Sequence, residues 1–226
     1  MRDETVLGVA LKASQRRSST TVQLSVQGNL PSIGSFGENS ELLKLVQWIN
    51  PELIAIGCPL SLPAGLHCLE PSCSCKMQFP ERKGRVAEQR LLEVGIPCFV
   101  INKSCPANIR PFIYRGIKLS NELRKLGHSV IEVYPSATKL ILFGDSAPPK
   151  RATSAYLNYL KRELPSLIPG LEPFVQHGLS LGVYEALLNS YTAVLHLRGE
   201  TLSMGDSQEG LIIVPEHGKN PIFTAR

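Results

Sequence analysis

The chain has 226 residues, of which 43% are hydrophobic and 19% charged, values typical of a folded globular protein and not of a disordered one. Its formal net charge of +5 is a mild basic excess, which is compatible with a polyanionic partner but does not require one. No apolar run approaches the roughly 20 residues that a membrane span needs. The first residues also lack the apolar core of a signal peptide, so we expect a cytoplasmic protein without a membrane partner, folded as one domain over residues 1–226.

The first quarter of the chain predicts strands before any helix. Residues 5–11 form an apolar run typical of a buried strand, and residues 18–26 alternate as an antiparallel neighbour would. A turn-rich connection with at most a short strand follows at 29–37. Residues 38–49 then carry the apolar spacing of an amphipathic helix, and 52–57 form a second buried strand.

The next part of the chain opens with an unusually long connection. Residues 58–80 are rich in Pro, Cys, Ser and Gly, and a connection of this length in a compact domain is usually functional or held by a ligand. Helices are expected at 82–94 and at 110–126, the second of which is basic and ends at Gly127. Between them, residues 98–101 predict a short strand or extended piece.

The last part of the chain is mostly helical. Residues 129–134 predict a strong strand that Pro135 ends, and 211–215 predict a late strand. Helices are expected at 152–164 and 183–197. Alternation of strands and helices after a β-rich opening predicts an α/β fold with a mixed sheet.

Several segments of the chain resemble a known family, the widespread bacterial domain-of-unknown-function family 429, whose members are described as predicted nucleases. The matching segments are IAIGCPLSLP (54–63), GRVAEQRLLEVGIPCF (84–99), YRGIKLSNELRKLGHSVIEVYPSATKLILFG (114–144), ALLNSYTAVLHLRGE (186–200) and EGLIIVP (209–215). The most specific element is IEVYP-x-A-T-K with an upstream Y-R-G-I. The resemblance implies an RNase H-like (ribonuclease H/resolvase-like) α/β fold, a mixed sheet flanked by helices, and phosphodiester chemistry with Mg²⁺ or Mn²⁺.

The same resemblance shows where the chain departs from the family. Ala10 stands where the family carries an aspartate on the first strand, and Gly57 stands at the next acidic position. Glu185 replaces an aspartate at the start of the last helix. Glu132, on the IEVY strand, is the other carboxylate left as a catalytic candidate.

The missing acids matter because of the metal chemistry of such a site. Mg²⁺ takes hard oxygen ligands in octahedral geometry, and paired ions need a carboxylate between them. Ala10 and Gly57 provide none, so Glu132 and Glu185, with His177 nearby in sequence, would hold at most one weakly bound ion. The alternatives are that Glu132 is a strand-end acid paired with an Arg or Lys, and that Glu185 is a first-turn acid stabilised by the helix dipole.

The long connection contains a second candidate metal site. Cys68, Cys73 and Cys75 lie within eight positions, as expected of a zinc site in a reducing compartment. A fourth ligand would come from Cys98, Cys105 or His67, and Cys98 is included in the predicted set. The alternative is that the three thiols are simply reduced cysteines of a loop.

Basic residues suggest a phosphate-facing surface. Arg110, Arg115 and Lys118 lie on the predicted helix 110–126, and Lys139 follows the IEVYP segment, so these four are the candidate nucleic-acid contacts. The alternative is an ordinary solvated helix face. Arg85 and Glu88 are spaced to pair on one helix face, either as a site element or as a weak surface ion pair.

Three functions follow from these observations. The first is a catalytically impaired RNase H-like protein that binds nucleic acid or a protein partner. The second is an active metal-dependent nuclease that uses Glu132 and Glu185. The third is a zinc-clamped structural or interaction protein.

Overall fold

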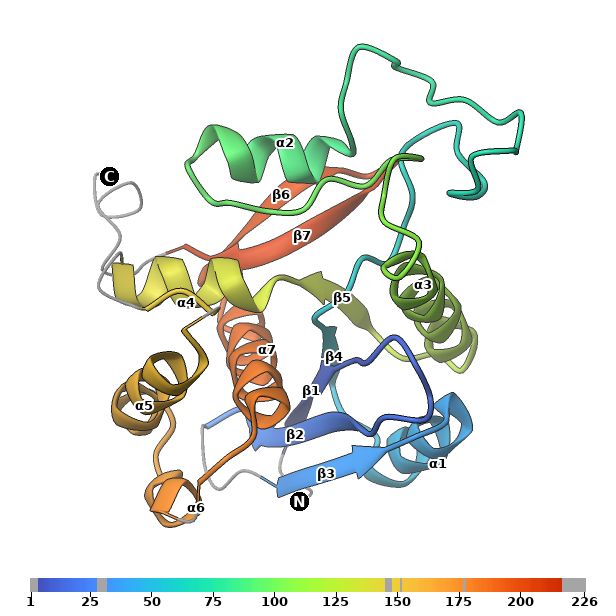
Figure 1. The fold of residues 1–226 in the computed structure, drawn as a ribbon. Coiled ribbons are helices and arrows are strands. Elements are labelled where there is room, and N and C mark those ends of the chain that lie inside the picture. The colour runs from blue at the N-terminus through green and yellow to red at the C-terminus, as the bar shows by residue number, and fades with distance from the viewer. Residues whose placement is uncertain (1–3, 28–31, 145–147, 151, 177, 217–226) are drawn as a thin grey trace.

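The computed structural model describes residues 4–27, 32–144, 148–150, 152–176 and 178–216, and a seven-stranded sheet runs through them (Figure 1). The strands are β1 (Thr5–Ala10), β2 (Ser19–Ser25), β3 (Ser32–Phe36), β4 (Leu53–Ile56), β5 (Val130–Val133), β6 (Thr201–Asp206) and β7 (Gly210–Pro215). The helices are α1 (Asn39–Ile49), α2 (Val86–Glu93), α3 (Arg110–Lys125), α4 (Pro135–Phe143), α5 (Thr153–Glu163), a 3₁₀ turn (Leu164–Ser166), α6 (Glu172–Gln176) and α7 (Leu181–Leu197).

The order and direction of the strands define the fold. The sheet order is β3-β2-β1-β4-β5-β7-β6, in which β2 runs antiparallel to β1 and β3, while β1, β4, β5 and β7 run parallel. The first five strands thus have the 3-2-1-4-5 order of an RNase H-like α/β fold, as the sequence predicted. β6 pairs antiparallel with β7 and extends the sheet beyond that arrangement.

Helices cover both faces of the sheet. Helices α1 and α3 pack on the face that carries Leu7, Val9, Ile54 and Ile56, and α5 and α7 pack on the face that carries Val6, Ala10 and Ala55 (Figure 1). Helix α2 lies over the β6–β7 hairpin. None of the helices in the described ranges has the length and apolar character needed to cross a bilayer.

The elements that the sequence left out or misassigned are short. The turn-rich connection at 29–37 contains β3, and the strand β6 and the helix α4 were not predicted. Of the two expectations for 98–101, the strand was wrong, since the segment is neither strand nor helix. Cys98 and Ile101 hydrogen-bond to Glu88 of α2. Helix α4 begins directly at Pro135, whose fixed φ suits the first turn of a helix.

Helix α7 packs against β1 at a position where only glycine fits. A Cβ atom added at Gly8 would lie 2.2 Å from the backbone oxygen of Ala186 and 2.4 Å from the backbone nitrogen of Ser190. These neighbours are helix backbone, which cannot rotate away as a side chain could. The close approach sets the distance of α7 from the sheet, and with it the position of every side chain that α7 directs at the strand ends.

We therefore predict that Gly8→Ala destabilises the protein by about 1–3 kcal/mol or more, because the added methyl group must push α7 off the sheet. Chemical denaturation followed by circular dichroism measures the change. The exposed substitution Gln47→Ala on α1 is the control and should change stability by less than about 0.5 kcal/mol. Equal stability of Gly8→Ala and wild type would mean that α7 does not sit this close to β1.

Candidate functional site

The positions singled out by the sequence lie at one end of the sheet. Ala10 ends β1, Gly57 follows β4, and Glu132 lies in β5 beside Ile56. These residues and Glu185 of α7 line a cavity of about 370 Å³ with mainly apolar walls. This end of the sheet, outside the carboxyl ends of parallel strands, is where ligands bind in open α/β sheets.

The side chains at these positions do not all point the same way. Ala10 packs with residues of α7, and a Cβ atom at Gly57 would contact Asn189 of α7. Glu132 points to the other face of the sheet, because it lies beside Ile56, whose side chain packs in the core under α1 and α3. The two acidic candidates, Glu132 and Glu185, therefore approach the strand ends from opposite faces of the sheet.

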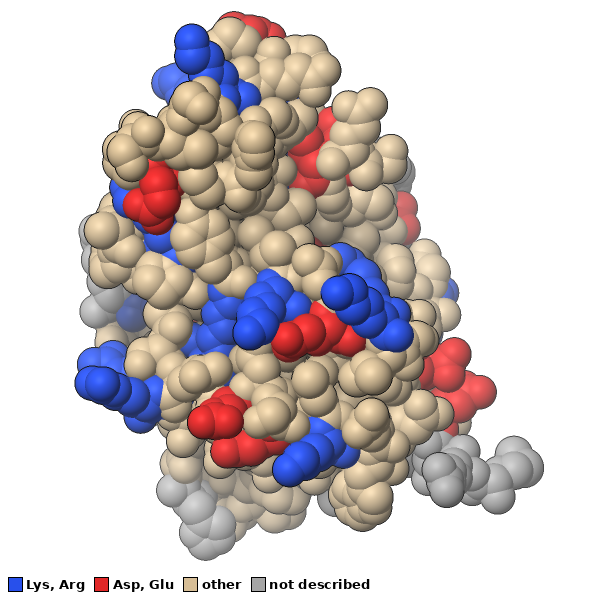
Figure 2. Space-filling view, turned by 90° about the vertical axis from the view of Figure 1, so that its right-hand side faces the viewer, with Lys and Arg blue, Asp and Glu red and all other residues tan. Residues whose placement is uncertain are grey.

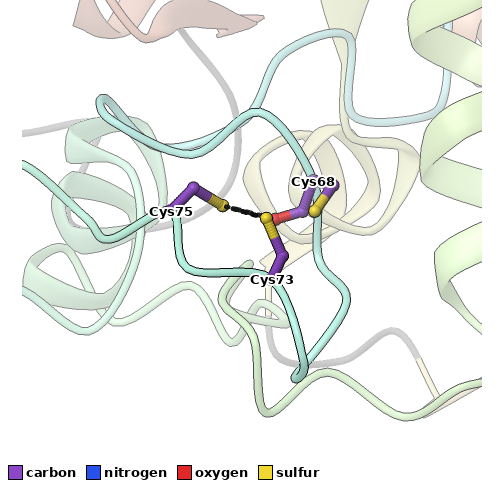
Figure 3. A group of neighbouring side chains, drawn as sticks. All are labelled: Cys68, Cys73 and Cys75. Carbon is purple, nitrogen blue, oxygen red and sulfur yellow. Dashed lines mark hydrogen bonds between the residues drawn. The ribbon is translucent and has the colours of Figure 1, made fainter.

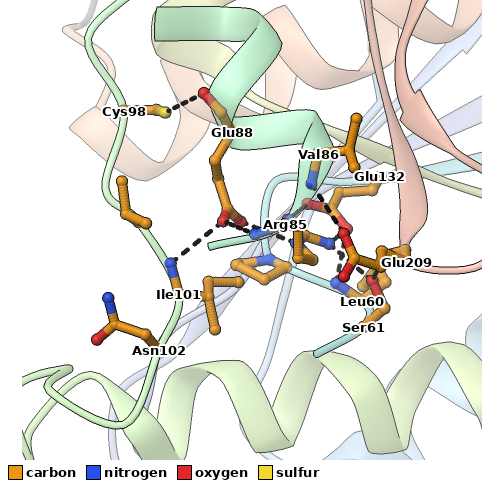
Figure 4. Close-up of polar contacts among 12 residues, drawn as sticks. Leu60, Ser61, Arg85, Val86, Glu88, Cys98, Ile101, Asn102, Glu132 and Glu209 are labelled. Atoms are coloured by element: carbon orange, nitrogen blue, oxygen red, sulfur yellow. Dashed lines mark hydrogen bonds and ion pairs between the residues drawn. The ribbon is translucent and has the colours of Figure 1, made fainter. Parts of the chain in front are cut away.

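The carboxylate of Glu132 is bound by the buried guanidinium of Arg85 (Figure 4). Arg85 is 1% exposed and donates from Nη1 and Nη2 to the two oxygens of Glu132, over 2.8 and 2.6 Å. Its Nε donates to Glu88 over 2.8 Å, and Nη1 also reaches the hydroxyl of Ser61. The expectation of a weak surface pair between Arg85 and Glu88 was wrong, because both side chains are buried.

Backbone N–H groups complete the hydrogen bonding of the two carboxylates that Arg85 binds. Leu60 donates to Glu132, while the backbone N–H groups of Arg85 and Ile101 donate to Glu88. Burial raises the pKa of Glu88 above its ordinary value, despite the opposing effect of Arg85. Burial also opposes charge on Arg85, but the neighbouring carboxylates, Glu132 foremost, raise its pKa and keep it charged. The pairing of Glu132 with an arginine is thus the alternative that the sequence left open.

A second buried ion pair lies beside the first and was not anticipated. Glu209, in the β6–β7 turn, is 1% exposed and receives two hydrogen bonds from Arg82, of 3.0 and 3.2 Å. The backbone N–H groups of Ala64 and Val86 also donate to it. The pair thus joins the long connection, the start of α2 and the β-hairpin, and no spacing in the sequence indicates it.

Removing the central cation should be costly. We predict that Arg85→Met destabilises the protein by about 3–5 kcal/mol, because two buried carboxylates lose their partner. Without Arg85 the pKa of Glu88, which burial already raises, should rise further, so protonation favours the folded state of the variant. The loss should then be smallest near about pH 5 and grow towards about pH 8.

Denaturant unfolding at several pH values tests this prediction. Lys118→Met is the matched control, since Lys118 forms an exposed pair with Glu122 at 3.9 Å whose loss should cost less than about 1 kcal/mol. If Arg85→Met were as stable as Lys118→Met at every pH, the buried network would not have the role assigned to it.

Asn189 occupies the space left by the missing side chain at position 57. A Cβ atom on Gly57 would lie 2.6 Å from Asn189 Nδ2. That amide nitrogen donates over 2.9 Å to the backbone oxygen of Val9, which also accepts from Gly57. Asn189 Oδ1 is buried and has no hydrogen-bond partner among the described residues. The amide thus ties α7 to the end of β1 where a carboxylate at position 57 would otherwise project.

Glu185 is the carboxylate on the α7 side of the cavity. It contacts the ammonium of Lys150, and its side chain is 14% exposed. Helix α7 begins at Leu181, with Ser180 as its N-cap, so Glu185 lies beyond the first turn. The expected first-turn position, and the dipole argument that went with it, were therefore wrong. His177, its possible companion in sequence, lies outside the described residues.

The four predicted nucleic-acid contacts do not form one basic surface. Arg115 is buried and donates to Asn39, Ser19 and two backbone oxygens, and Lys139 is buried and donates to the backbone oxygen of Pro148. Burial lowers the pKa of both groups. Arg110 pairs with Glu70 over 3.2 Å, so Lys118, in an exposed pair with Glu122 at 3.9 Å, is the most accessible of the four.

The surface of this side of the molecule is mixed in charge. Figure 2 shows Lys and Arg interleaved with Asp and Glu rather than gathered in one patch. Two exposed cations of the β1–β2 loop, Arg16 and Arg17, were not among the predicted contacts. They form no ion pair with a described residue. Lys12, in the same loop, lines the cavity. Ala13 and Gln15 of this loop share a groove with Lys118, so the loop and α3 border one surface.

Three of the four cysteines predicted to share a metal site lie together, and all three belong to the long connection. The Sγ atoms of Cys68, Cys73 and Cys75 all lie within 4.8 Å of one another (Figure 3). Cys98 does not join them, because it lies beside α2 with its thiol donating to the backbone oxygen of Glu88. Its inclusion in the metal-binding set was therefore wrong. Cys105 is buried in the same hydrophobic cluster as Cys75, but its sulfur accepts from the backbone N–H of Asn102 and is not among the three that meet.

Comparisons with known proteins give little beyond the fold. No protein-family model matches the chain, and no curated protein matches it. Among solved structures, that of Thermus thermophilus RuvC aligns over 86% of this chain and 96% of its own, with a TM-score of 0.43 and 12% sequence identity. The assignment of the RNase H-like fold rests on the strand order and directions described above.

Proposed function

We propose that this protein is a non-hydrolytic RNase H-like protein that binds nucleic acid, and that it belongs to family 429. The first part rests on the side chains found at the carboxyl ends of the parallel strands. Ala10 and Gly57 offer no carboxylate, Glu132 is neutralised by Arg85, and Glu185 contacts Lys150. One partly engaged carboxylate cannot hold the paired ions of phosphodiester hydrolysis, so Mg²⁺ or Mn²⁺ would bind only weakly.

The family part of the proposal is supported by where the most specific matching segments lie. Tyr114 of the Y-R-G-I segment accepts a hydrogen bond from the backbone of Leu69, and Gly116 lets α3 pack on Cys58. Arg85 and Glu132, from two other matching segments, form the buried ion pair. The matched residues therefore hold one end of the sheet together, which is a reason for them to recur as a set.

Nucleic-acid binding is supported by the exposed cations at that same end. Lys12 of the β1–β2 loop lines the cavity and Lys118 of α3 lines the adjoining groove. The exposed Arg16 and Arg17 follow Lys12 in the same loop. The carboxylates at this site, Glu132 and Glu185, contact Arg85 and Lys150, so less negative charge opposes the attraction of the exposed cations for phosphate. We also propose that residues 1–226 form one domain and that the protein acts in the cytoplasm.

Binding can be separated from cleavage in one set of measurements. We predict that labelled DNA or RNA binds in a salt-dependent manner without being cut in Mg²⁺ or Mn²⁺, as followed by fluorescence anisotropy and gel analysis. Arg16→Ala/Arg17→Ala should lower the slope of log K against log salt by up to about 2 for duplex DNA, since each phosphate contact contributes about 0.9.

The matched control is Lys161→Ala/Arg162→Ala, which removes two exposed cations from α5. The control should bind as wild type does. Absence of salt-dependent binding by wild type would refute the nucleic-acid part. Metal-dependent cleavage that Glu185→Gln abolishes would instead support the active nuclease.

We also predict that restoring the two acids does not restore a metal site. In Ala10→Asp/Gly57→Asp the new side chain at position 57 collides with Asn189, so the variant should be destabilised and should bind Mn²⁺ no better than wild type. Adding Asn189→Ala frees that space, so the triple variant should be more stable than the double variant and should bind Mn²⁺ more tightly than wild type. Calorimetric titration of both variants with Mn²⁺ checks this, and tight binding by the double variant would contradict it.

The second candidate is a zinc-clamped interaction protein, which the convergence of Cys68, Cys73 and Cys75 favours. Here Zn²⁺ would fix the long connection as a surface for a protein partner. This candidate differs from the first in predicting no salt-dependent affinity for DNA or RNA.

A further inference from the structure

The three thiols are spaced as the ligands of one metal ion. Zinc–sulfur bonds of about 2.3 Å place the sulfurs of a tetrahedral site about 3.8 Å apart. The Sγ atoms of Cys73 and Cys75 are 3.4 Å apart, and those of all three cysteines lie within 4.8 Å of one another. A central ion would therefore need only small side-chain adjustments to contact all three sulfurs.

Two further hydrogen bonds hold the cluster. The Sγ atom of Cys75 donates to the backbone oxygen of Cys68 over 3.7 Å, and Lys103 donates to the backbone oxygen of Cys73. Sulfur donors are preferred by soft and borderline cations such as Zn²⁺, so three cysteines at this spacing suit such an ion.

The loop that carries the cysteines is anchored without an ion. Leu66 and Leu69 are buried against Ile113 of α3, and the backbone N–H of Leu69 donates to Tyr114 over 2.6 Å. Arg110 pairs with Glu70 in the same loop. A metal ion at the cluster therefore acts on a loop that is already packed against the domain, and the fold as a whole does not depend on it.

Among the residues that the structure describes, no fourth His, Cys, Asp or Glu side chain joins the three sulfurs. Cys98 and Cys105 hydrogen-bond to groups outside the cluster. The imidazole of His67 is exposed, and its nitrogens are not among the ligand atoms that meet there. Zinc sites that serve structure alone are closed by four protein ligands, whereas an open position accepts water or an incoming group.

We propose that Cys68, Cys73 and Cys75 bind one Zn²⁺ ion as three thiolates and leave its fourth position open to an exchangeable ligand from outside the chain. The inference rests on the zinc binding of the second candidate function and deepens it. It identifies the chemistry of the partner, which is a group with a nitrogen or sulfur donor such as an imidazole or a thiolate.

The experiment uses the full chain loaded with Zn²⁺ or with Co²⁺, whose absorption reports on its ligands. Wild type should retain one Zn²⁺ per chain after dialysis, as measured by elemental analysis. The Co²⁺ form should show sulfur-to-cobalt charge transfer and the visible bands of a tetrahedral site. Titration with imidazole should shift those bands, because imidazole replaces the exchangeable ligand.

Variants decide which residues take part. Cys73→Ser should lose stoichiometric metal, while the matched control Cys98→Ser should keep it and keep the Co²⁺ spectrum. His67→Ala should also keep it and still respond to imidazole. Circular dichroism of Cys73→Ser should equal that of wild type, which separates loss of a ligand from loss of the fold.

Three results would overturn the inference. These are a wild-type protein that retains no metal, loss of metal in Cys98→Ser, and a Co²⁺ spectrum that imidazole leaves unchanged. Nucleic-acid affinity is measured separately on the same proteins, and Cys73→Ser should bind DNA or RNA as wild type does. Failure of the metal site and failure of the first proposed function are therefore distinguishable.

Discussion

The buried guanidinium of Arg85 is the interaction on which this end of the molecule depends. It binds Glu132 with two parallel hydrogen bonds and Glu88 with a third, so it joins β5 to the first turn of α2. Burying three charges is expensive unless nearly every donor and acceptor is used. Backbone groups of Leu60 and Ile101 complete the set, and they fix the segments that follow β4 and α2. The planar fork of arginine matches this arrangement in a way that a lysine ammonium could not.

This network limits the ability of the remaining acidic side chains to bind a divalent cation. A carboxylate with both oxygens committed to an arginine is a poor ligand for a divalent cation, however well its position in the sheet suits catalysis. The strand alternation then separates Glu132 from Glu185, because they approach from different faces. What the strand ends retain is a cavity with mainly apolar walls, which Lys12 and Lys150 line together with Glu88, Glu132 and Glu185.

The sequence predicted the parts of the fold that periodicity determines. The buried strands β1, β4 and β5 and the long amphipathic helices α1 and α3 were placed within a few residues. β6 and α4 were missed, because TLSMGD lacks a clear alternation and because Pro135 was taken only as the end of a strand. The meeting of Cys68 with Cys73 and Cys75 followed from proximity along the chain. By contrast, the burial of Arg115 depends on Asn39 and other residues far away in sequence, which the charge pattern of one helix does not encode.

The amide of Asn189 has a consequence for which substitutions positions 57 and 189 can tolerate. Asn189 fills the space beside Gly57 and joins α7 to the carbonyl oxygen of Val9, so any side chain added at position 57 meets an occupied volume. A substitution that empties position 189 first gives up the hydrogen bond that fastens the helix. The two positions are therefore coupled, and the effects of changing them on stability should not add.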